Sequence, residues 1–82
     1  MSREEVKQRV FQVTAREFGI DPATINEASH FVDDLGADSL KSIELVAAYE
    51  EEFDVEVNEE EALRVQTVGG AIDFFAKLLG VD

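Results

Sequence analysis

Three stretches of this chain repeat their apolar residues at the spacing of an α-helix, and this pattern restricts the fold more than any other feature. Within each stretch the apolar residues recur three or four positions apart, which places them on one face of a helix. These helices are expected at residues 3–17, 39–53 and 68–79, with a short helix at 59–64. The sequence therefore predicts an all-α fold, a small bundle of three longer helices plus one short helix.

Cap residues mark the ends of the expected helices. Ser2 and Glu5 have the spacing of a capping box at the start of the first helix, and Gly19 ends that helix. Asn58 is a suitable cap for the short helix, and Thr67 for the last one. Each of these residues satisfies backbone groups that a helix end leaves unpaired. The caps therefore support the boundaries that the apolar spacing indicates.

Two apolar stripes define the expected core, because a stripe must face the other helices to leave water. The second helix contributes Ser42, Leu45, Val46, Tyr49 and Phe53. The last helix contributes Val68, Ala71, Ile72, Phe75, Leu78 and Leu79. Gly69 and Gly70 lie in the first turn of the last helix, where each costs up to about 1 kcal/mol relative to alanine. That turn is therefore expected to fray.

Residues 19–37 show no sustained period and form a long loop between the first two helices. Loops of this length are usually functional or disordered. Five apolar residues within the segment favour an ordered loop that is anchored to the core. The expected anchors are Ile20, Ile25, Phe31, Val32 and Leu35.

The acidic balance of the chain restricts its partners. Nineteen Asp and Glu residues against seven Lys and Arg residues give a net charge of −12. Nucleic acids and anionic membranes need a basic surface, so neither is an expected partner. Basic protein surfaces are favoured instead, with fast and salt-sensitive encounter.

The length and the missing residue types restrict the class of protein. Eighty-two residues allow a single domain, residues 1–82, which is too small to enclose a deep catalytic cleft. The chain has no cysteine and no segment near the ~20 apolar residues of a membrane span. Its first twenty residues lack the apolar run of a signal peptide. A cytoplasmic monomer is expected.

Ser39 stands at the expected start of the second helix. The exposed N–H groups and the positive dipole end of a helix favour an anion there, so Ser39 is a candidate for a phosphate-linked group. An isolated serine at a helix start is more often an N-cap, and position alone leaves that alternative open. His30, the single histidine, is interpreted as a loop residue. No nucleophile–base pair and no metal cluster is evident, so neither catalysis nor metal binding is expected.

The segments around Ser39 together resemble the acyl carrier proteins. The similar segments run over 31–35, 36–40, 43–46, 50–53, 67–68 and 71–73, so the resemblance covers essentially the whole chain in length and order. It implies that the Ser39 hydroxyl bears a covalent 4′-phosphopantetheine transferred from coenzyme A. The terminal thiol of that arm would carry acyl groups as thioesters between enzymes of fatty acid or of specialised acyl or polyketide biosynthesis.

The resemblance also implies a partner face for a phosphopantetheinyl transferase and for acyl-processing enzymes with basic surfaces. The residues expected on this face are Asp38, Leu40, Lys41, Glu44, Ala47, Glu50 and Glu51. Two of them depart from the family. Lys41 stands where many carriers of fatty acid synthesis have an acid, and Ala47 replaces a larger apolar residue. Together these departures favour a specialised carrier.

The core also departs from the family, because Tyr49 and Phe75 are bulkier than the aliphatic residues usual at their positions. We hypothesise that they shrink the interior space in which the family shelters acyl chains. Phe11 lies off the apolar stripe of the first helix, which consists of Val6, Val10 and Val13. It is expected to pack against the last helix or the loop, rather than to contact a partner.

Two alternatives remain beside the acyl carrier. An aminoacyl or peptidyl carrier more often has a pair of glycines before the serine, where this chain has Ala37 and Asp38. A cofactor-free acidic helical adaptor would explain the charge, but it would not explain a serine at the helix start.

Overall fold

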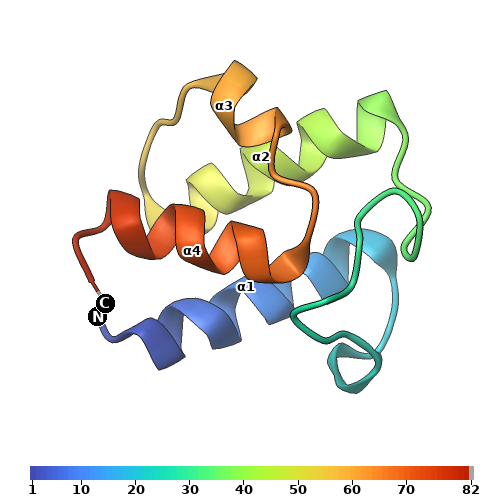
Figure 1. The fold of residues 1–82 in the computed structure, drawn as a ribbon, viewed down its shortest axis with the longest axis horizontal. Helices are drawn as coiled ribbons and strands as arrows, with labels where there is room; N and C mark the ends of the chain where they lie inside the picture. Colours follow the sequence, from blue (N-terminus) through green and yellow to red (C-terminus); the bar gives the residue numbers. More distant parts are fainter. Residues whose placement is uncertain (82) are drawn as a thin grey trace.

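The computed structural model describes residues 1–81, so Asp82, the last residue of the expected domain, lies outside the described residues (Figure 1). The helices are α1 (Arg3–Phe18), the 3-10 helix η1 (Pro22–Thr24), α2 (Ser39–Phe53), α3 (Glu59–Leu63) and α4 (Val68–Leu78). Residues 1–81 form no strand and contain one isolated β-bridge, between His30 and Thr67. The predicted all-α bundle is confirmed, and η1 is the one helical element that the sequence did not predict.

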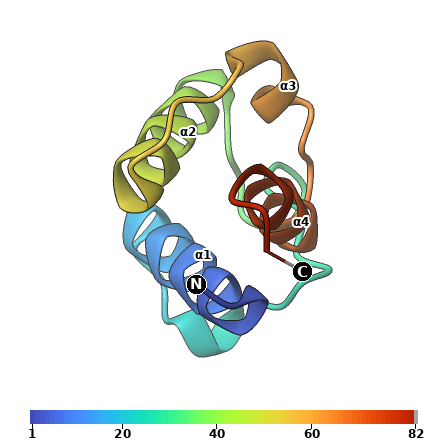
Figure 2. The ribbon, with the colours of Figure 1, turned by 90° about the vertical axis from the view of Figure 1, so that its left-hand side faces the viewer.

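The helices are arranged around α1, which packs against both α2 and α4. The chain direction reverses from α1 to α2, and α4 runs the same way as α2 (Figure 1). The short α3 packs beside α2, on the side away from α1 (Figure 2). The long loop crosses one end of the bundle and joins the end of α1 to the start of α2, at the right of Figure 1. This loop therefore positions the N-terminus of α2.

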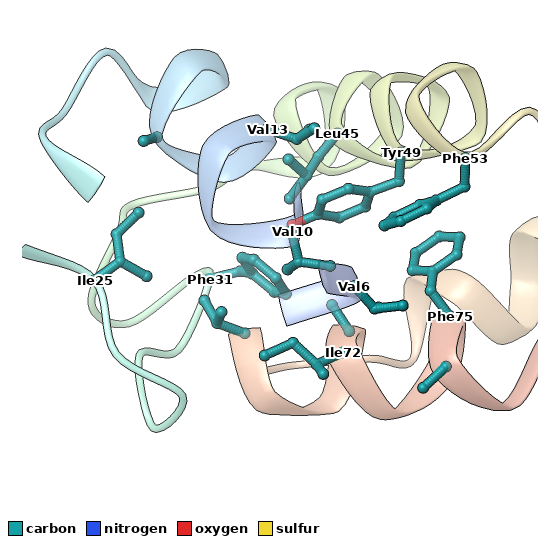
Figure 3. Packing of buried hydrophobic residues seen from close by; sticks show 14 of the residues in the cluster. Val6, Val10, Val13, Ile25, Phe31, Leu45, Tyr49, Phe53, Ile72 and Phe75 are labelled. Carbon is teal, nitrogen blue, oxygen red and sulfur yellow. The ribbon is translucent and has the colours of Figure 1, made fainter. Parts of the chain in front are cut away.

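The core lies between α1, α2 and α4 and is rich in aromatic rings (Figure 3). The expected stripe of α2 is confirmed by the buried Leu45, Tyr49 and Phe53. In α4 the prediction is wrong for Leu78, which is 46% exposed, while Ala76 is buried. The buried face of α4 follows four-residue spacing, so Leu78 falls about a quarter turn to its side.

The core also takes in a side chain that the stripe of α1 does not include. Phe11 is half-buried and packs against the core cluster, while its contact with the last helix or the loop in particular stays a prediction. Contact with its own molecule therefore explains Phe11 without a partner.

The long loop is ordered, but two of its five expected anchors are at the surface. Ile25 and Phe31 are buried and Leu35 is half-buried, whereas Ile20 and Val32 are exposed. Ile20 lies where the loop leaves α1. Its N–H donates a hydrogen bond to the Ala15 carbonyl oxygen at 3.0 Å and so closes the end of that helix, while the Ile20 side chain stays exposed. That closure is a backbone interaction, so the apolar side chain of Ile20 is not needed for it.

The second anchor at the surface, Val32, lies in a tight turn of the loop. The N–H groups of Asp34 and Leu35 both donate to the His30 carbonyl oxygen. This helix-like turn buries Phe31 and leaves Val32 facing water.

The first turn of α4, which was expected to fray, is formed and is hydrogen-bonded to the long loop. The N–H of Val68 donates to the Ser29 carbonyl oxygen at 3.0 Å, and the N–H of Gly69 donates to that of Glu27 at 2.8 Å. A Cβ atom on Gly69 would lie 2.9 Å from the same Glu27 oxygen. Gly69 would weaken an isolated helix, but in this fold its missing side chain allows the Glu27 backbone to lie against α4.

Candidate functional site

Ser39 is the first residue of α2, and its neighbour Asp38 caps that helix. The Asp38 Oδ1 atom accepts a hydrogen bond from the Lys41 N–H at 2.8 Å. The Asp38 carbonyl oxygen accepts another from the Ser42 N–H at 2.9 Å. The alternative that Ser39 is itself the N-cap is therefore wrong, since that role belongs to Asp38.

The Ser39 hydroxyl is exposed and has no hydrogen-bond partner within residues 1–81. The backbone N–H groups of Ser39 and Leu40 also have no partner among these residues. Unpaired N–H groups and the helix dipole together favour an anion at the start of α2. The site thus offers a free hydroxyl beside two donors suited to a phosphate.

Ser39 is held in place by the loop that precedes it. Gly36 turns the chain with a φ of +76°, which glycine adopts without a steric penalty. Ala37 is buried and its N–H donates to the Phe31 carbonyl oxygen at 2.9 Å. Phe31 in turn donates its N–H to the Gln66 carbonyl oxygen, ahead of α4. These contacts fix the start of α2 relative to α4.

Two hollows lie beside Ser39. The first is open to water and is lined by Val32, Ala37, Asp38, Ser39, Ser42, Ile43 and Leu63. The second is an apolar cavity of about 180 Å³ whose walls come from the loop, α2, α3, the segment after α3 and α4. Val32, Ser42 and Leu63 line both hollows. The open hollow at Ser39 and the apolar cavity are therefore neighbours that share part of their walls.

Three exposed apolar side chains line the open hollow: Val32, Ile43 and Leu63. Leu40, which follows Ser39 in the chain, is more exposed than any of them, at 65%. The sequence predicted Leu40 on the partner face and Val32 as a core anchor, and it did not identify Leu63. No local signal connects Leu63 with Ser39, because the two come together only when α3 packs against α2.

The structure divides the seven expected partner-face residues into two groups. Asp38, Leu40, Glu44, Ala47 and Glu51 are exposed, whereas Lys41 and Glu50 are half-buried. The Glu50 carboxylate accepts a hydrogen bond from the Val57 N–H at 2.9 Å and ties the following loop to α2. This internal bond occupies one of its two carboxylate oxygens.

Lys41 is turned toward α1 rather than away from the molecule. Its Nζ atom donates to the Glu17 carbonyl oxygen at 3.0 Å and lies 5.9 Å from the centre of the Phe18 ring. Glu44 pairs with the same amine at 3.6 Å. The Lys41 ammonium group therefore binds the C-terminal end of α1 and forms an ion pair with Glu44, one of the acids on the α2 face.

The remaining polar groups near the loop make local contacts. The His30 Nδ1 atom accepts a hydrogen bond from the Asp33 N–H at 3.2 Å, which fits the interpretation of His30 as a loop residue. Residues 1–81 contain no group of three or more potential metal ligands close together. Within the same residues, no helix has both the length and the apolar character needed to cross a membrane.

Comparison with known proteins gives two findings. Residues 8–82 match the family model described as the phosphopantetheine attachment site. The chain is also 45% identical, over 76 residues, to the acyl carrier protein of Phenylobacterium zucineum (strain HLK1). That alignment covers 93% of this chain and 96% of the relative.

Proposed function

The chain belongs to the acyl carrier proteins, which bear a phosphopantetheine arm, and from this membership we propose that Ser39 is the residue that bears the arm. The observation that carries the proposal is the free Ser39 hydroxyl beside two unpaired N–H groups at the start of α2. A phosphodiester formed there would be stabilised by the positive end of the helix dipole and by hydrogen bonds from the two N–H groups. Transfer from coenzyme A would join the Ser39 oxygen to the phosphorus and release the adenosine 3′,5′-bisphosphate portion.

Acyl carrier proteins are carriers rather than catalysts, and we propose that the whole chain, residues 1–82, works as one such carrier domain. The arm provides the thiol that a chain without cysteine lacks. Acyl groups would travel as thioesters between enzymes of fatty acid or of specialised acyl biosynthesis. The location in the cytoplasm and the monomeric state stay predictions.

The family membership favours the acyl carrier over both alternatives. It brings a cofactor, which the cofactor-free adaptor would not have. The curated relative is an acyl carrier, which favours acyl over aminoacyl cargo.

Carrier proteins interact in general with transferases and acyl-processing enzymes, and we propose that they approach this chain along the outer face of α2. Leu40 and Ala47 would supply apolar contact, and Glu44 and Glu51 would supply charge, because all four are exposed. Asp38 is exposed too but already caps α2. Lys41 and Glu50 have internal partners, so their contribution to a partner would be smaller than that of the exposed residues.

Intact-mass measurement tests the attachment. The chain is incubated with coenzyme A and a broad-specificity phosphopantetheinyl transferase, beside Ser39→Ala and the control Ser42→Ala. One arm is expected on the parent chain and on Ser42→Ala, and none on Ser39→Ala. An arm on Ser39→Ala would place the attachment elsewhere.

A further inference from the structure

The cavity beside Ser39 ends abruptly at one level of the bundle. On α2 its lining residues include Ser42 and Tyr49, but Phe53, the next residue of the stripe, does not line it. On α4 the lining reaches Phe75 and stops there. Tyr49 and Phe75 are therefore the last residues of these two helices to line the cavity, at the end away from the start of α2, and we refer to their rings as its end wall.

Tyr49 is held in the wall by its hydroxyl group. The Tyr49 Oη atom lies 2.5 Å from the Thr14 Oγ1 atom, and Thr14 donates its own proton to the Val10 carbonyl oxygen at 2.6 Å. Thr14 has one hydroxyl proton, so Tyr49 is the donor of the bond between them. Both side chains are almost fully buried, with Tyr49 only 3% exposed. Moving the ring aside would strand a buried hydroxyl donor.

The ring of Tyr49 is also fixed by aromatic neighbours (Figure 3). Its centroid lies 5.3 Å from that of Phe75, at an interplanar angle of 59°. Phe75 stacks on Phe53 at 5.1 Å and meets Phe74 edge-on at 5.2 Å. Phe75 thus has a ring on three sides, and the wall has little freedom to retreat.

We propose that the hydrogen bond between Tyr49 and Thr14 locks the end wall of the cavity and sets an upper limit on the length of acyl chain that the carrier shelters. The proposal rests on the attachment of the arm at Ser39. A dry cavity of about 150 Å³ holds one benzene molecule, so the 180 Å³ available here holds roughly six to eight carbons. Longer chains would leave their remaining carbons in water or at a partner.

The test loads the holo protein with saturated acyl groups of two to fourteen carbons and measures the thermal midpoint of each product. The midpoint is expected to rise by at most about 3–6 °C per sheltered methylene and to become constant near eight carbons. Tyr49 is the only tyrosine and the chain has no tryptophan, so tyrosine emission reports contact with the wall directly. That emission is expected to change only once the chain reaches about six carbons.

Four variants test whether the hydrogen bond between Tyr49 and Thr14 sets the limit on chain length. Tyr49→Val removes the ring and should extend the rise by roughly two carbons. Tyr49→Phe and Thr14→Val keep the wall but remove the hydrogen bond. A ten-carbon chain should therefore raise the midpoint of these variants further than an eight-carbon chain does, whereas in the parent the two chains should give the same midpoint. Ile25→Val is the control, because Ile25 is also buried, at 5% exposed, but it neither lines the cavity nor belongs to the cluster of rings around Phe75. The control should keep the parent limit.

A midpoint that rises steadily to fourteen carbons in the parent, or that no chain raises, would overturn the proposal. A limit that is the same in the parent and in all three Tyr49 and Thr14 variants would do so as well. If no arm can be attached, the proposed function fails, and the length limit of the cavity is then tested with ligands that need no arm. Free primary alcohols of four to twelve carbons then replace the acyl groups in the same melting series.

Discussion

At the residue scale, Asp38 and Ser39 divide the tasks at the start of α2. Asp38 accepts the Lys41 N–H and caps the helix, so the Ser39 hydroxyl needs no structural partner. A serine that also capped the helix would accept that bond with a phosphate ester oxygen after modification, which is a poorer acceptor than a hydroxyl. The order of these two residues therefore separates stability from modification.

Replacing Asp38 distinguishes its cap from its charge. Asp38→Ala should lower the free energy of unfolding by about 1 kcal/mol, and Asp38→Asn should lower it by much less, because asparagine also caps helices. Urea unfolding of both variants measures this difference. If Asp38 also contacts the transferase, Asp38→Asn will be modified more slowly while keeping its stability. Equal destabilisation by alanine and asparagine would contradict the role as a cap.

The Tyr49 hydroxyl should make stability depend on alkaline pH. Burial raises its pKa above the ordinary value of about 10, and the negative charge of Glu17 adds to the rise. The contribution is therefore complete below pH 10, where folded and unfolded chains both keep the proton. Above pH 10 only the unfolded chain releases it, so the free energy of unfolding falls by up to about 1.4 kcal/mol per pH unit.

Unfolding of the parent and of Tyr49→Phe between pH 9 and 11.5 measures this effect. The variant keeps the ring but has no phenolic proton to release, and the two chains are otherwise identical. The steeper decline is expected in the parent only. Parallel curves would show that the Tyr49 hydroxyl ionises as easily in the folded protein as in the unfolded chain.

At the scale of the elements, Lys41 joins the start of α2 to the end of α1. Its amine donates to the Glu17 carbonyl oxygen, one of the last carbonyls of α1, where the helix dipole favours a cation. The side chain is two-thirds buried, so water weakens this contact less than it weakens an exposed ion pair. The residue that departs from the family in charge thus has a structural explanation within this molecule.

Lys41→Met should lower the free energy of unfolding by about 1 kcal/mol, because the apolar stem is kept and the charged hydrogen bond is lost. Lys77→Met is the matched control, since Lys77 is exposed and forms no salt bridge within residues 1–81. Chemical denaturation compares the two variants. Equal and negligible losses would mean that the amine is not held by α1 in solution.

At the scale of the whole molecule, a net charge of −12 is confined within 30 × 27 × 19 Å. The Debye length is about 30 Å at 0.01 M salt, so every charge then acts on every other across the molecule. At 0.1 M salt it falls to about 10 Å, and mutual repulsion is reduced to near neighbours. Repulsion within the folded chain should therefore depend strongly on ionic strength.

Raising the salt from 0.01 to 0.3 M should increase the free energy of unfolding by about 1–2 kcal/mol. Urea unfolding in potassium chloride measures this gain, and choline chloride at equal ionic strength serves as the control. An equal increase in the free energy of unfolding in both salts indicates screening of charge. An increase in potassium chloride alone indicates that the chain binds potassium ions. A loss of stability with salt would mean that the ion pairs outweigh the repulsion.

The sequence alone determined the four α-helices, the N-caps of α1, α3 and α4, the acidic balance and the candidate Ser39. These properties depend on residues within about four positions of one another, so a linear pattern contains them. The boundaries of α2 and the caps Asn58 and Thr67 were predicted for this reason. The resemblance to a family rested on the same local segments.

Only the tertiary structure decided which surfaces meet. It brought Leu63 of α3 to the rim beside Ser39 and placed Thr14 of α1 against Tyr49 of α2. It also turned a glycine that weakens an isolated helix, Gly69, into the point where the loop approaches α4. Contacts between distant segments depend on how whole helices pack, and packing depends on the shape of every buried side chain at once. The limit of the cavity is therefore a property of the fold.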